Sequence, residues 1–538
     1  MLLKGKTNYW HYLLLAFFTG GFLWLAWPPF HTAFLIFIGL VPLLYINDAD
    51  KGVKNKGFRR VSLTYLTFLF WNIFTTWWIW YASPGGAILA IVLNAMLMTI
   101  PFGLFNLVKA KAGKTTGYVS LICFWLSFEY VHLHWELTWP WLTLGNVWAG
   151  LPNWVQWYEY TGALGGTFWI LLVNILIYEG LTIKNKRRNY LGAASLLIVI
   201  PYLLSLVILL NLPGNTGMKT NANAVVIQPN IDPYNVKFDA ASYGSQISGL
   251  ITLSQQAIDS NTVVLIWPET AIADDVYEKT AINNEYVNAV HTFLKSHPKL
   301  KLISGIDSKT YYGEKNKTIT SDLADSEKGI WVDHFNAAVL MDTGNKLQFY
   351  HKSMLVPGVE KIPYPQIFGF FNKYIIANGG YGGSLGSQSE PSVFKINSKL
   401  VIAPVICYES VFGDYVSQYI RKGATMIAII TNDGWWQDSP GHIQHLEYGA
   451  LRAIEFRRFI ARSANTGISC FILPDGKIIK PTDWWQPVAI KENIILNDKM
   501  TFYALYGDYI GRVACWISCA LLVFAVWRGR VRGRRSEK

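Results

Sequence analysis

Long apolar runs constrain the fold of this sequence more than any other feature. Eight of them are each about long enough to cross the roughly 30 Å hydrocarbon layer of a membrane, and they occupy residues 9–27, 30–47, 61–82, 86–108, 117–134, 162–183, 190–212 and 509–527. Within that layer every backbone N–H and C=O must be hydrogen-bonded inside the protein, so single runs of this length cross it as α-helices. We therefore expect a polytopic α-helical membrane protein, with seven spans in a transmembrane domain at 1–212 and an eighth at 509–527.

The basic residues predict the direction in which the chain crosses. Lys and Arg cluster at 4–6, 51–60, 109–114, 184–188 and 528–538, whereas 61–108 and 115–183 contain none. By the positive-inside rule both termini, including the basic tail 528–538, are cytoplasmic and the segment 213–508 faces outward. These flanks also explain the net charge of +12, because 213–508 carries 26 basic and 28 acidic side chains. Nucleic acid is therefore not an expected partner.

The first apolar run and the stretch 135–160 need a separate interpretation. The first run follows Lys4 and Lys6 as in a signal peptide, but it is long and ends in Trp27-Pro28-Pro29 without a small-residue cleavage site. We expect it to be a retained span. The stretch 135–160 is too polar and too rich in proline to cross, and its many Trp residues are typical of an interfacial loop, here on the outer side.

Strand-like and helix-like segments alternate between the seventh and eighth runs. Short β-branched runs at 224–228, 263–267, 300–305, 400–406 and 424–431 are separated by amphipathic stretches such as 240–260 and 283–296. This pattern predicts an outward-facing α/β domain over 213–508, large enough for its own core. The runs at 263–267 and 400–406 are almost unbroken, so we expect central strands, whose ends are the usual place for chemistry.

Cys407 is a candidate nucleophile because it stands where the run 400–406 gives way to polar residues. A cysteine nucleophile needs a proton acceptor and a group that stabilises the oxyanion. Glu269, which closes an apolar run, and Lys352, which follows Phe349-Tyr350-His351, supply those two chemistries. Ordinary roles remain open: a disulfide between Cys407 and Cys470 or a buried thiol, a helix-cap neighbour for Glu269, and a solvated lysine.

Together these three segments resemble the nitrilase superfamily, which has a Glu after Trp-Pro at a strand end, a Lys after an aromatic strand, and a Cys followed one residue later by Glu. The eight-span frame, with the domain inserted before the last span, is similar to the membrane-embedded branch of apolipoprotein N-acyltransferases. Further matching segments are Gln228-Pro229-Asn230-Ile231, Ser304-Gly305-Ile306-Asp307, Phe335-Asn336, Leu355-Val356-Pro357, Thr431-Asn432-Asp433-Gly434-Trp435-Trp436, Arg452-Ala453-Ile454-Glu455, Arg462-Ser463-Ala464-Asn465-Thr466-Gly467 and Tyr506-Gly507-Asp508.

The resemblance implies a nitrilase-like domain of α-β-β-α layers with a catalytic triad of Glu269, Lys352 and Cys407, and neither cofactor nor metal. It also implies a ping-pong reaction in which Cys407 takes an acyl chain from the sn-1 ester of a phospholipid. The thioester then acylates the α-amine of diacylglyceryl-cysteine in an apolipoprotein. The expected setting is a bacterial inner membrane, with the catalytic domain on the periplasmic side, membrane lipids as partners and a monomeric enzyme.

Four further residues receive roles from the resemblance. Glu360 supports the triad, Tyr408 and Glu409 shape the acyl site, and Phe238 stands, after a one-residue shift, where the family commonly has Trp. The backbone N–H of Tyr408 is in addition a candidate oxyanion donor. The turn after Lys352 departs from the common pattern, because it contains Met354 and Pro357-Gly358-Val359, but its spacing to Glu360 is kept.

Three other interpretations stay open. One is a nitrilase-type amidase that the spans merely anchor. Another is a transporter or lipid-binding protein with an inactive outer domain, in which carboxylates near or within the runs act as relay groups: Glu129, Glu136, Glu159 and Glu179. A third is a zinc site on one helical face, formed by His442, His445 and Glu447, although their spacing matches no metalloprotease motif.

Overall fold

The chain forms two compact units. The first unit consists of Met1–Trp80, Pro84–Leu209 and Tyr506–Lys538, and the second consists of Tyr81–Ser83 and Leu210–Leu505. The computed structural model describes residues 9–48, 56–212, 217–313, 318–325, 329–369 and 384–536. The basic residues at 4–6 and 51–55, the expected domain junction at 213 and the last two residues of the basic tail lie outside the described residues.

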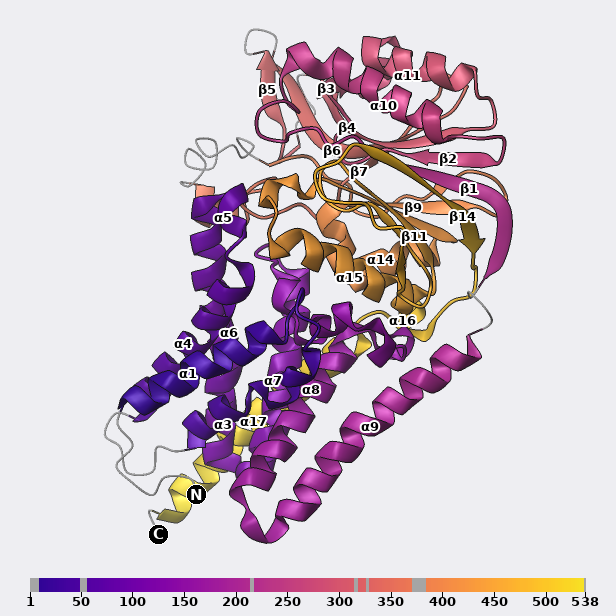
Figure 1. Cartoon of the computed structure of the whole chain (residues 1–538). Helices are drawn as coiled ribbons and strands as arrows, with labels where there is room; N and C mark the ends of the chain where they lie inside the picture. Colours follow the sequence, from indigo (N-terminus) through magenta and orange to yellow (C-terminus); the bar gives the residue numbers. More distant parts are fainter. Residues whose placement is uncertain are drawn as a thin grey trace. The chain divides into compact units, whose positions relative to one another are not determined.

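The first unit is built mainly from helices, most of which are long (Figure 1). They are α1 (Tyr9–Leu25), α2 (Ile36–Gly39), α3 (Val41–Asp48), α4 (Lys56–Thr76), α6 (Pro84–Ala112), α7 (Lys114–His134), α8 (Tyr158–Thr182), α9 (Arg187–Asn211) and α17 (Tyr509–Ser536). Helix α6 packs against α4 and α7, and α17 packs against α6 and α7. The sequences of α6, α8 and α9 are apolar on every face over most of their length, as expected of helices that face lipid or a core on every side.

Four segments in the described part of the chain are long and apolar enough to cross a membrane: Pro84–Ala112, Tyr158–Thr182, Lys184–Asn211 and Tyr509–Val531. They correspond to four of the eight expected spans. Helix α1 has 17 residues, and the second apolar run forms the shorter pieces α2 and α3. A helical membrane unit is thus supported, while the count of eight spans stays a prediction.

The stretch 135–160 contributes Trp side chains to the core of the helical unit. It forms three short 3-10 helices, η2 (Pro140–Leu142), η3 (Leu144–Gly150) and η4 (Pro152–Trp154). Trp141 and Trp148 are buried, and the ring of Trp148 stacks on Trp154 and Trp169 with centroids 5.4 and 5.0 Å apart. Part of the tryptophan excess therefore serves internal aromatic packing rather than a lipid boundary.

The second unit contains two β-sheets. The first sheet has the order β14-β1-β2-β4-β6-β5, with β3 also paired to β4 and β7 to β6. Its strands are β1 (Met218–Gln228), β2 (Thr262–Ile266), β3 (Ile272–Tyr277), β4 (Lys301–Tyr312), β5 (Asp322–Asp325), β6 (Ile330–Met341), β7 (Gln348–His351) and β14 (Val488–Leu496).

The second sheet has the order β13-β12-β11-β10-β9-β8. Its strands are β8 (Phe394–Lys395), β9 (Val401–Ile406), β10 (Met426–Thr431), β11 (Phe459–Ala464), β12 (Cys470–Ile472) and β13 (Ile478–Ile479). Strands β9, β10 and β11 run parallel and are almost wholly buried. Such strands need cover on both faces.

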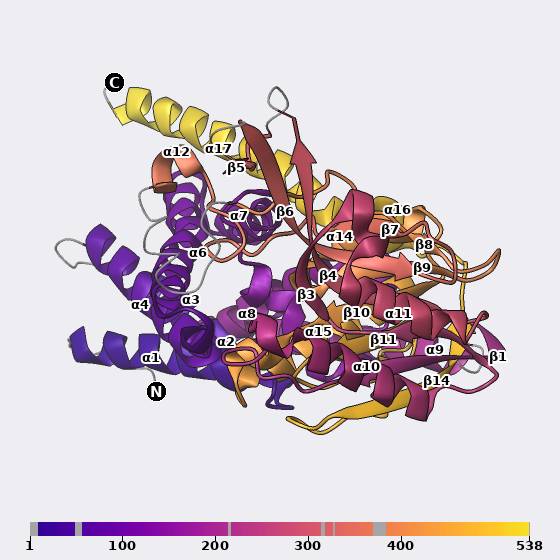
Figure 2. The same cartoon turned by 90° about the horizontal axis from the view of Figure 1, so that it is seen from above.

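Helices cover the outer faces of both sheets. Helices α10 (Tyr243–Ala257) and α11 (Glu285–Lys295) lie side by side over the first sheet, and α14 (Gly413–Arg421) and α15 (Pro440–Phe456) lie against the second (Figures 1 and 2). One core cluster joins Leu250 of α10 and Val290 of α11 to strand residues such as Leu265 and Leu302. The result is the expected α-β-β-α layering.

The strand-like and helix-like segments of the sequence fall on strands and helices of the structure. The run 263–267 became β2, which lies between β1 and β4 inside its sheet. The prediction that 400–406 is a central strand was only partly right, because its neighbour on one side is the two-residue edge strand β8. Helices and the first sheet still bury this strand, so its unbroken apolar pattern could not reveal the nearby edge.

Candidate active site

Glu269 follows the end of β2 by three residues, after Trp267 and Pro268, and is 6 % exposed. The backbone here passes so close to β4 that a Cβ atom on Gly305 would overlap the main chain of 268–270. Gly305 therefore permits the approach that places the Glu269 carboxylate. Trp267 anchors the same strand end, since its ring N–H donates to Ser254 Oγ of α10 at 3.0 Å.

Lys352 lies directly after β7 and is 1 % exposed. Its Nζ donates to Glu269 Oε1 at 3.0 Å and to Glu360 Oε1 at 2.8 Å. Burial alone would lower the pKa of Lys352, but the charges of Glu269 and Glu360 hold it well above its ordinary value. The ammonium is therefore kept charged in a site from which water is largely excluded.

Asn336 of β6 completes this cluster, although it was not among the predicted site residues. Its Nδ2 donates to Glu269 Oε1 at 2.8 Å and to Glu360 Oε1 at 2.9 Å, the same two oxygens that Lys352 contacts. Its backbone carbonyl accepts from Lys352 N at 2.9 Å. Among the described residues Glu269 Oε2 has no hydrogen-bond partner, so one oxygen of this carboxylate is fixed and the other can exchange a proton.

Cys407 is the first residue after β9 and is half-buried. Its backbone has a φ of 49°, in the left-handed region that non-glycine residues rarely adopt. It opens the 3-10 helix η9 (Cys407–Val411), so the chain turns sharply at the thiol. A strained turn that projects a side chain from a strand end is typical of a functional position.

The thiol lies within the electrostatic influence of the cluster. Burial raises the pKa of Cys407, the charge of Glu269 raises it further, and the charge of Lys352 lowers it. Burial likewise raises the pKa of Cys470 to about 12. The resting thiol of Cys407 is thus protonated, and activating it requires a base nearby.

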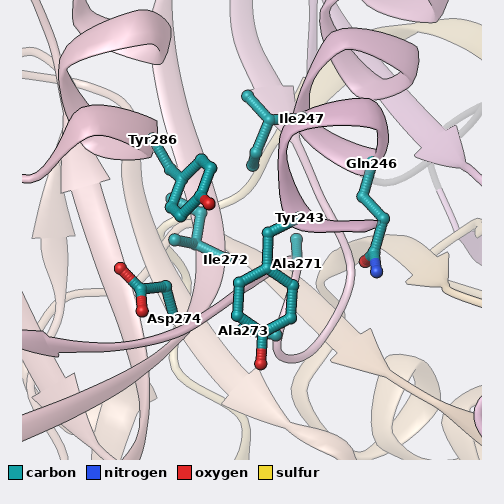
Figure 3. Close-up of a pocket in the computed structure, with 8 residues that line it drawn as sticks. All are labelled: Tyr243, Gln246, Ile247, Ala271, Ile272, Ala273, Asp274 and Tyr286. Carbon is teal, nitrogen blue, oxygen red and sulfur yellow. The ribbon is translucent and has the colours of Figure 1, made fainter. Parts of the chain in front are cut away.

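The one pocket outlined in Figure 3 lies on the helix side of the first sheet. It is lined by Tyr243, Gln246, Ile247, Ala271, Ile272, Ala273, Asp274 and Tyr286, which come from α10, α11 and the chain around β3. None of these residues belongs to the cluster around Lys352. The candidate active site is therefore defined by its side-chain contacts and not by this pocket.

Two family models match the sequence. Residues 19–176 match the apolipoprotein N-acyltransferase N-terminal domain, and residues 224–494, half of the chain, match the carbon-nitrogen hydrolase family. The chain belongs to the apolipoprotein N-acyltransferases of the carbon-nitrogen hydrolase family. It is accordingly an enzyme of the acyltransferase class.

Curated apolipoprotein N-acyltransferases are similar over almost the whole chain. The protein from Chlorobaculum tepidum is 29% identical over 515 residues, covering 94% of each chain. The protein from Thermotoga maritima is 26% identical over 549 residues, covering 98% of this chain and 95% of its own. The similarity therefore extends through both the helical and the α/β units.

For a member of the apolipoprotein N-acyltransferases, the turn after Lys352 has an unusual sequence but brings Glu360 to the lysine. Gly358 adopts a φ of 80°, which suits glycine, and Glu360 N donates to Val356 O at 2.9 Å. Glu360 Oε2 in turn accepts from Val356 N at 2.8 Å. The loop thus closes on its own backbone and fixes the second carboxylate.

Glu409 links the segment around Lys352 to the turn at Cys407 through hydrogen bonds. Its Oε1 accepts from Tyr350 Oη at 2.6 Å and from Ser353 N at 2.7 Å, and its Oε2 accepts from Ile406 N at 2.9 Å. The side chain is fully buried, and burial raises its pKa. Glu409 is therefore placed to hold the two strand ends together, and it does not face open space.

The remaining predicted site residues differ in their surroundings. Tyr408 is buried and packs edge-on against Phe412, with ring centroids 5.0 Å apart. Phe238 is 49% exposed and stacks on Trp435 at 6.1 Å between centroids. The aromatic pair of Phe238 and Trp435 joins two of the segments that carried the resemblance, although neither ring contacts the lysine cluster in any described interaction.

The disulfide and zinc interpretations are not supported. Cys407 and Cys470 are both free thiols. His445 contacts Asp433 and Ser410 through its two ring nitrogens, and no three metal-binding side chains in the described ranges are placed to hold an ion. His445, one of the two histidines of the zinc interpretation, instead lies behind Cys407.

Proposed function

We propose that this enzyme transfers an acyl chain from the sn-1 position of a phospholipid, through a thioester on Cys407, to the α-amine of diacylglyceryl-cysteine in apolipoproteins. Family membership supports lipoprotein N-acylation. The observation that carries the proposed chemistry is the buried cluster in which Lys352 and Asn336 hold the same oxygens of Glu269 and Glu360.

In the first half-reaction Glu269 takes the thiol proton, and the Cys407 sulfur attacks the ester carbonyl. Negative charge develops on the carbonyl oxygen, where the Lys352 ammonium and the backbone N–H of Tyr408 stabilise it. The tetrahedral intermediate collapses with loss of the lysophospholipid alkoxide, which takes the proton from Glu269. Glu269 is then again a carboxylate, ready for the second substrate.

In the second half-reaction the α-amine of the acceptor attacks the thioester. Glu269 accepts a proton from the attacking nitrogen, the amide bond forms and the Cys407 sulfur leaves. The proton then returns to the sulfur, which regenerates the thiol. Both half-reactions pass through an oxyanion at one position, so a single set of donors serves both.

We further propose that the chain crosses a bacterial inner membrane eight times, with a transmembrane domain at 1–212, a periplasmic catalytic domain at 213–508, a last span at 509–527 and a cytoplasmic tail at 528–538. Both termini are then cytoplasmic, and the enzyme acts as a monomer among membrane lipids. The four long apolar segments and the distribution of Lys and Arg support this arrangement.

A membrane-anchored amidase would use the same three residues, so the test must follow the lipid. The parent protein in detergent is supplied with a phospholipid labelled in its sn-1 chain and a diacylated lipopeptide. We expect labelled triacylated peptide and one lysophospholipid per transfer. Hydrolysis of small amides without lipid turnover, or unlabelled triacylated peptide with the label left in the lysophospholipid, would contradict the proposal.

Cys470→Ala is the matched control for Cys407→Ala in this assay. Both cysteines lie in the α/β unit and both are free, but Cys470 is a buried residue of β12. We expect Cys407→Ala to abolish lysophospholipid release and Cys470→Ala to retain it. Retention by Cys407→Ala would exclude a thioester at that residue.

A further inference from the structure

A series of buried, hydrogen-bonded polar side chains, Arg462, Asp433, His445 and Ser410, lies behind Cys407 and is called the polar chain below. Arg462 of β11 donates through Nη2 to Asp433 Oδ2 at 2.6 Å, and Asp433 Oδ1 lies 2.9 Å from His445 Nδ1 of α15. The three side chains are at most 1 % exposed. The proposed reaction uses none of them, yet burying such groups is costly unless they are paired.

Asp433 is the fixed centre of the polar chain. Burial alone would raise its pKa, but the charges of Arg462 and His445 and their hydrogen bonds hold the pKa well below its usual range. Thr431 Oγ1 also donates to Asp433 Oδ1 at 2.8 Å. The carboxylate is thus held from three sides, which fixes the orientation of the His445 ring.

The other end of the polar chain reaches the backbone of Cys407. His445 Nε2 lies 2.9 Å from Ser410 Oγ and 3.2 Å from the carbonyl oxygen of Cys407. Ser410 Oγ donates to that same carbonyl at 2.7 Å. Because the serine has only one hydroxyl proton, its oxygen is left to accept from Nε2, and this arrangement, with Nδ1 donating to Asp433, requires a proton on both ring nitrogens. The polar chain therefore ends on the Cys407 carbonyl.

This carbonyl belongs to the same peptide group as the N–H of Tyr408. A peptide unit is planar, and in the trans form found here its C=O and N–H point in opposite directions. Holding the carbonyl toward His445 therefore directs the Tyr408 N–H away from His445. The left-handed φ of Cys407 costs on the order of 1 kcal/mol, so this peptide needs such support to keep one orientation.

We infer that His445 and Ser410 are positioning residues, which hold the Cys407–Tyr408 peptide so that its N–H meets the oxyanion during acyl transfer. The inference rests on the proposed nucleophile but not on the proposed lipid donor. It gives the Asp433–His445–Ser410 arrangement a role in orienting an N–H donor, without any proton transfer by the serine.

Two reactions of the same thiol separate this role from a general structural one. Alkylation of Cys407 by iodoacetamide needs the thiolate but develops no oxyanion. Acylation by a p-nitrophenyl ester of a fatty acid needs both the thiolate and the oxyanion donors. The full chain in detergent is used for both, and mass spectrometry of the Cys407 peptide measures each rate.

We expect Ser410→Ala to slow acylation by about 10- to 100-fold, since loss of one oxyanion donor typically costs on the order of 100-fold or more, while alkylation changes less than about threefold. Ser417→Ala is the matched control, because Ser417 is also buried and donates to a backbone carbonyl, that of Asp414. It should leave both rates near those of the parent.

Variants of His445 test which ring nitrogen matters. The Gln amide extends to roughly the position of Nε2, whereas the shorter Asn amide reaches that of Nδ1. We expect His445→Gln to retain much of the acylation rate and His445→Asn to lose as much as Ser410→Ala. The double variant Ser410→Ala/His445→Asn should lose little more than either single one.

Equal losses of alkylation and acylation, or an acylation rate unaffected by Ser410→Ala, would overturn the inference. Failure of the proposed lipid donor is a different result, in which the parent is acylated at Cys407 by the p-nitrophenyl ester but not by phospholipid. A parent that neither ester acylates at Cys407 would refute both. Because Ser410→Ala removes a single oxygen, it tests the inference even where the His445 variants fail to fold.

Discussion

Replacing Asn336 with Asp turns the donor shared by two carboxylates into a third carboxylate. Asn336 Nδ2 lies 2.8 Å from Glu269 Oε1 and 2.9 Å from Glu360 Oε1. At an effective dielectric of 20, each new contact between like charges costs about 6 kcal/mol. Protonating one of the three carboxyl groups at pH 7 costs only about 4 kcal/mol, three pH units above an ordinary pKa near 4. The cluster should therefore take up a proton.

The loss of stability in Asn336→Asp should therefore depend on pH. The coupled carboxyls of Asn336→Asp titrate above their unfolded pKa, so the destabilisation grows as pH rises, from about 1.4 kcal/mol at pH 5 to about 4 kcal/mol at pH 7. At roughly 2–4 °C per kcal/mol, the thermal midpoint should fall by about 3–6 °C at pH 5 and by about 8–16 °C at pH 7.

Thermal unfolding of the parent and the variant in detergent at pH 5, 6 and 7 measures this difference. Asn288→Asp, on the exposed face of α11, makes the same chemical change away from the cluster and should shift stability by less than about 0.5 kcal/mol at each pH. A loss for Asn336→Asp that is the same at pH 5 and pH 7 would show that its amide does not face two ionised carboxylates.

Three other substitutions test the supports of the site. Glu409→Gln turns an NH₂ toward a fixed donor such as Ile406 N, so the free energy of unfolding should fall by about 1–3 kcal/mol; a thermal midpoint equal to that of the parent would refute this. Lys237, which follows β1, is fully buried, and its Nζ has no hydrogen-bond partner among the described residues. Burial lowers its pKa to about 8, and the charges of Asp307 and Glu269 oppose this shift only in part. Lys237→Met should therefore raise the free energy of unfolding by roughly 3 kcal/mol at pH 7, a gain that shrinks from pH 8 to 10.5 as the parent's amine loses its proton. No gain in urea unfolding at pH 7 would contradict it. Gly305→Ala should displace Glu269 and slow acylation of the thiol at least tenfold, measured by a p-nitrophenolate burst, and an unchanged burst rate would show that the close approach is dispensable.

The strand ends that carry Glu269 and Cys407 could be predicted from the sequence because each follows an unbroken apolar run. Such runs are buried in parallel strands, and polar residues directly after them mark the edge of the sheet. Lys352 was harder to place, since most lysines are solvated. Its burial depends on two carboxylates that contact it, Glu269 from the loop after β2 and Glu360 from the turn that follows Lys352.

Asn336 could not be placed from periodicity. It lies within β6, and it reaches the cluster because β6 pairs antiparallel with β4 in a register that sets Asp307 opposite Asn336. No pattern within one segment encodes a register between two strands. The segment Phe335-Asn336 did belong to the resemblance, which was the only signal available for it.

The polar chain behind Cys407 was missed for a similar reason. Asp433, His445 and Arg462 come from the end of β10, from α15 and from β11, and each looks ordinary alone. The spacing of His442 and His445 suggested a shared helical face, but the ring nitrogens of His445 contact Asp433 and Ser410 rather than a metal site shared with His442. Tertiary packing, which no helical periodicity encodes, decides what a buried histidine contacts.

The covalent intermediate gives the most direct test of the account. The parent protein is mixed with phospholipid in detergent without a lipopeptide, digested at low pH and examined by mass spectrometry. The account predicts one fatty acyl group on the peptide that contains Cys407, released by neutral hydroxylamine and by added diacylated lipopeptide, with none on the Cys470 peptide. An acyl group on any other residue, or lipopeptide acylation by Cys407→Ala, would contradict it.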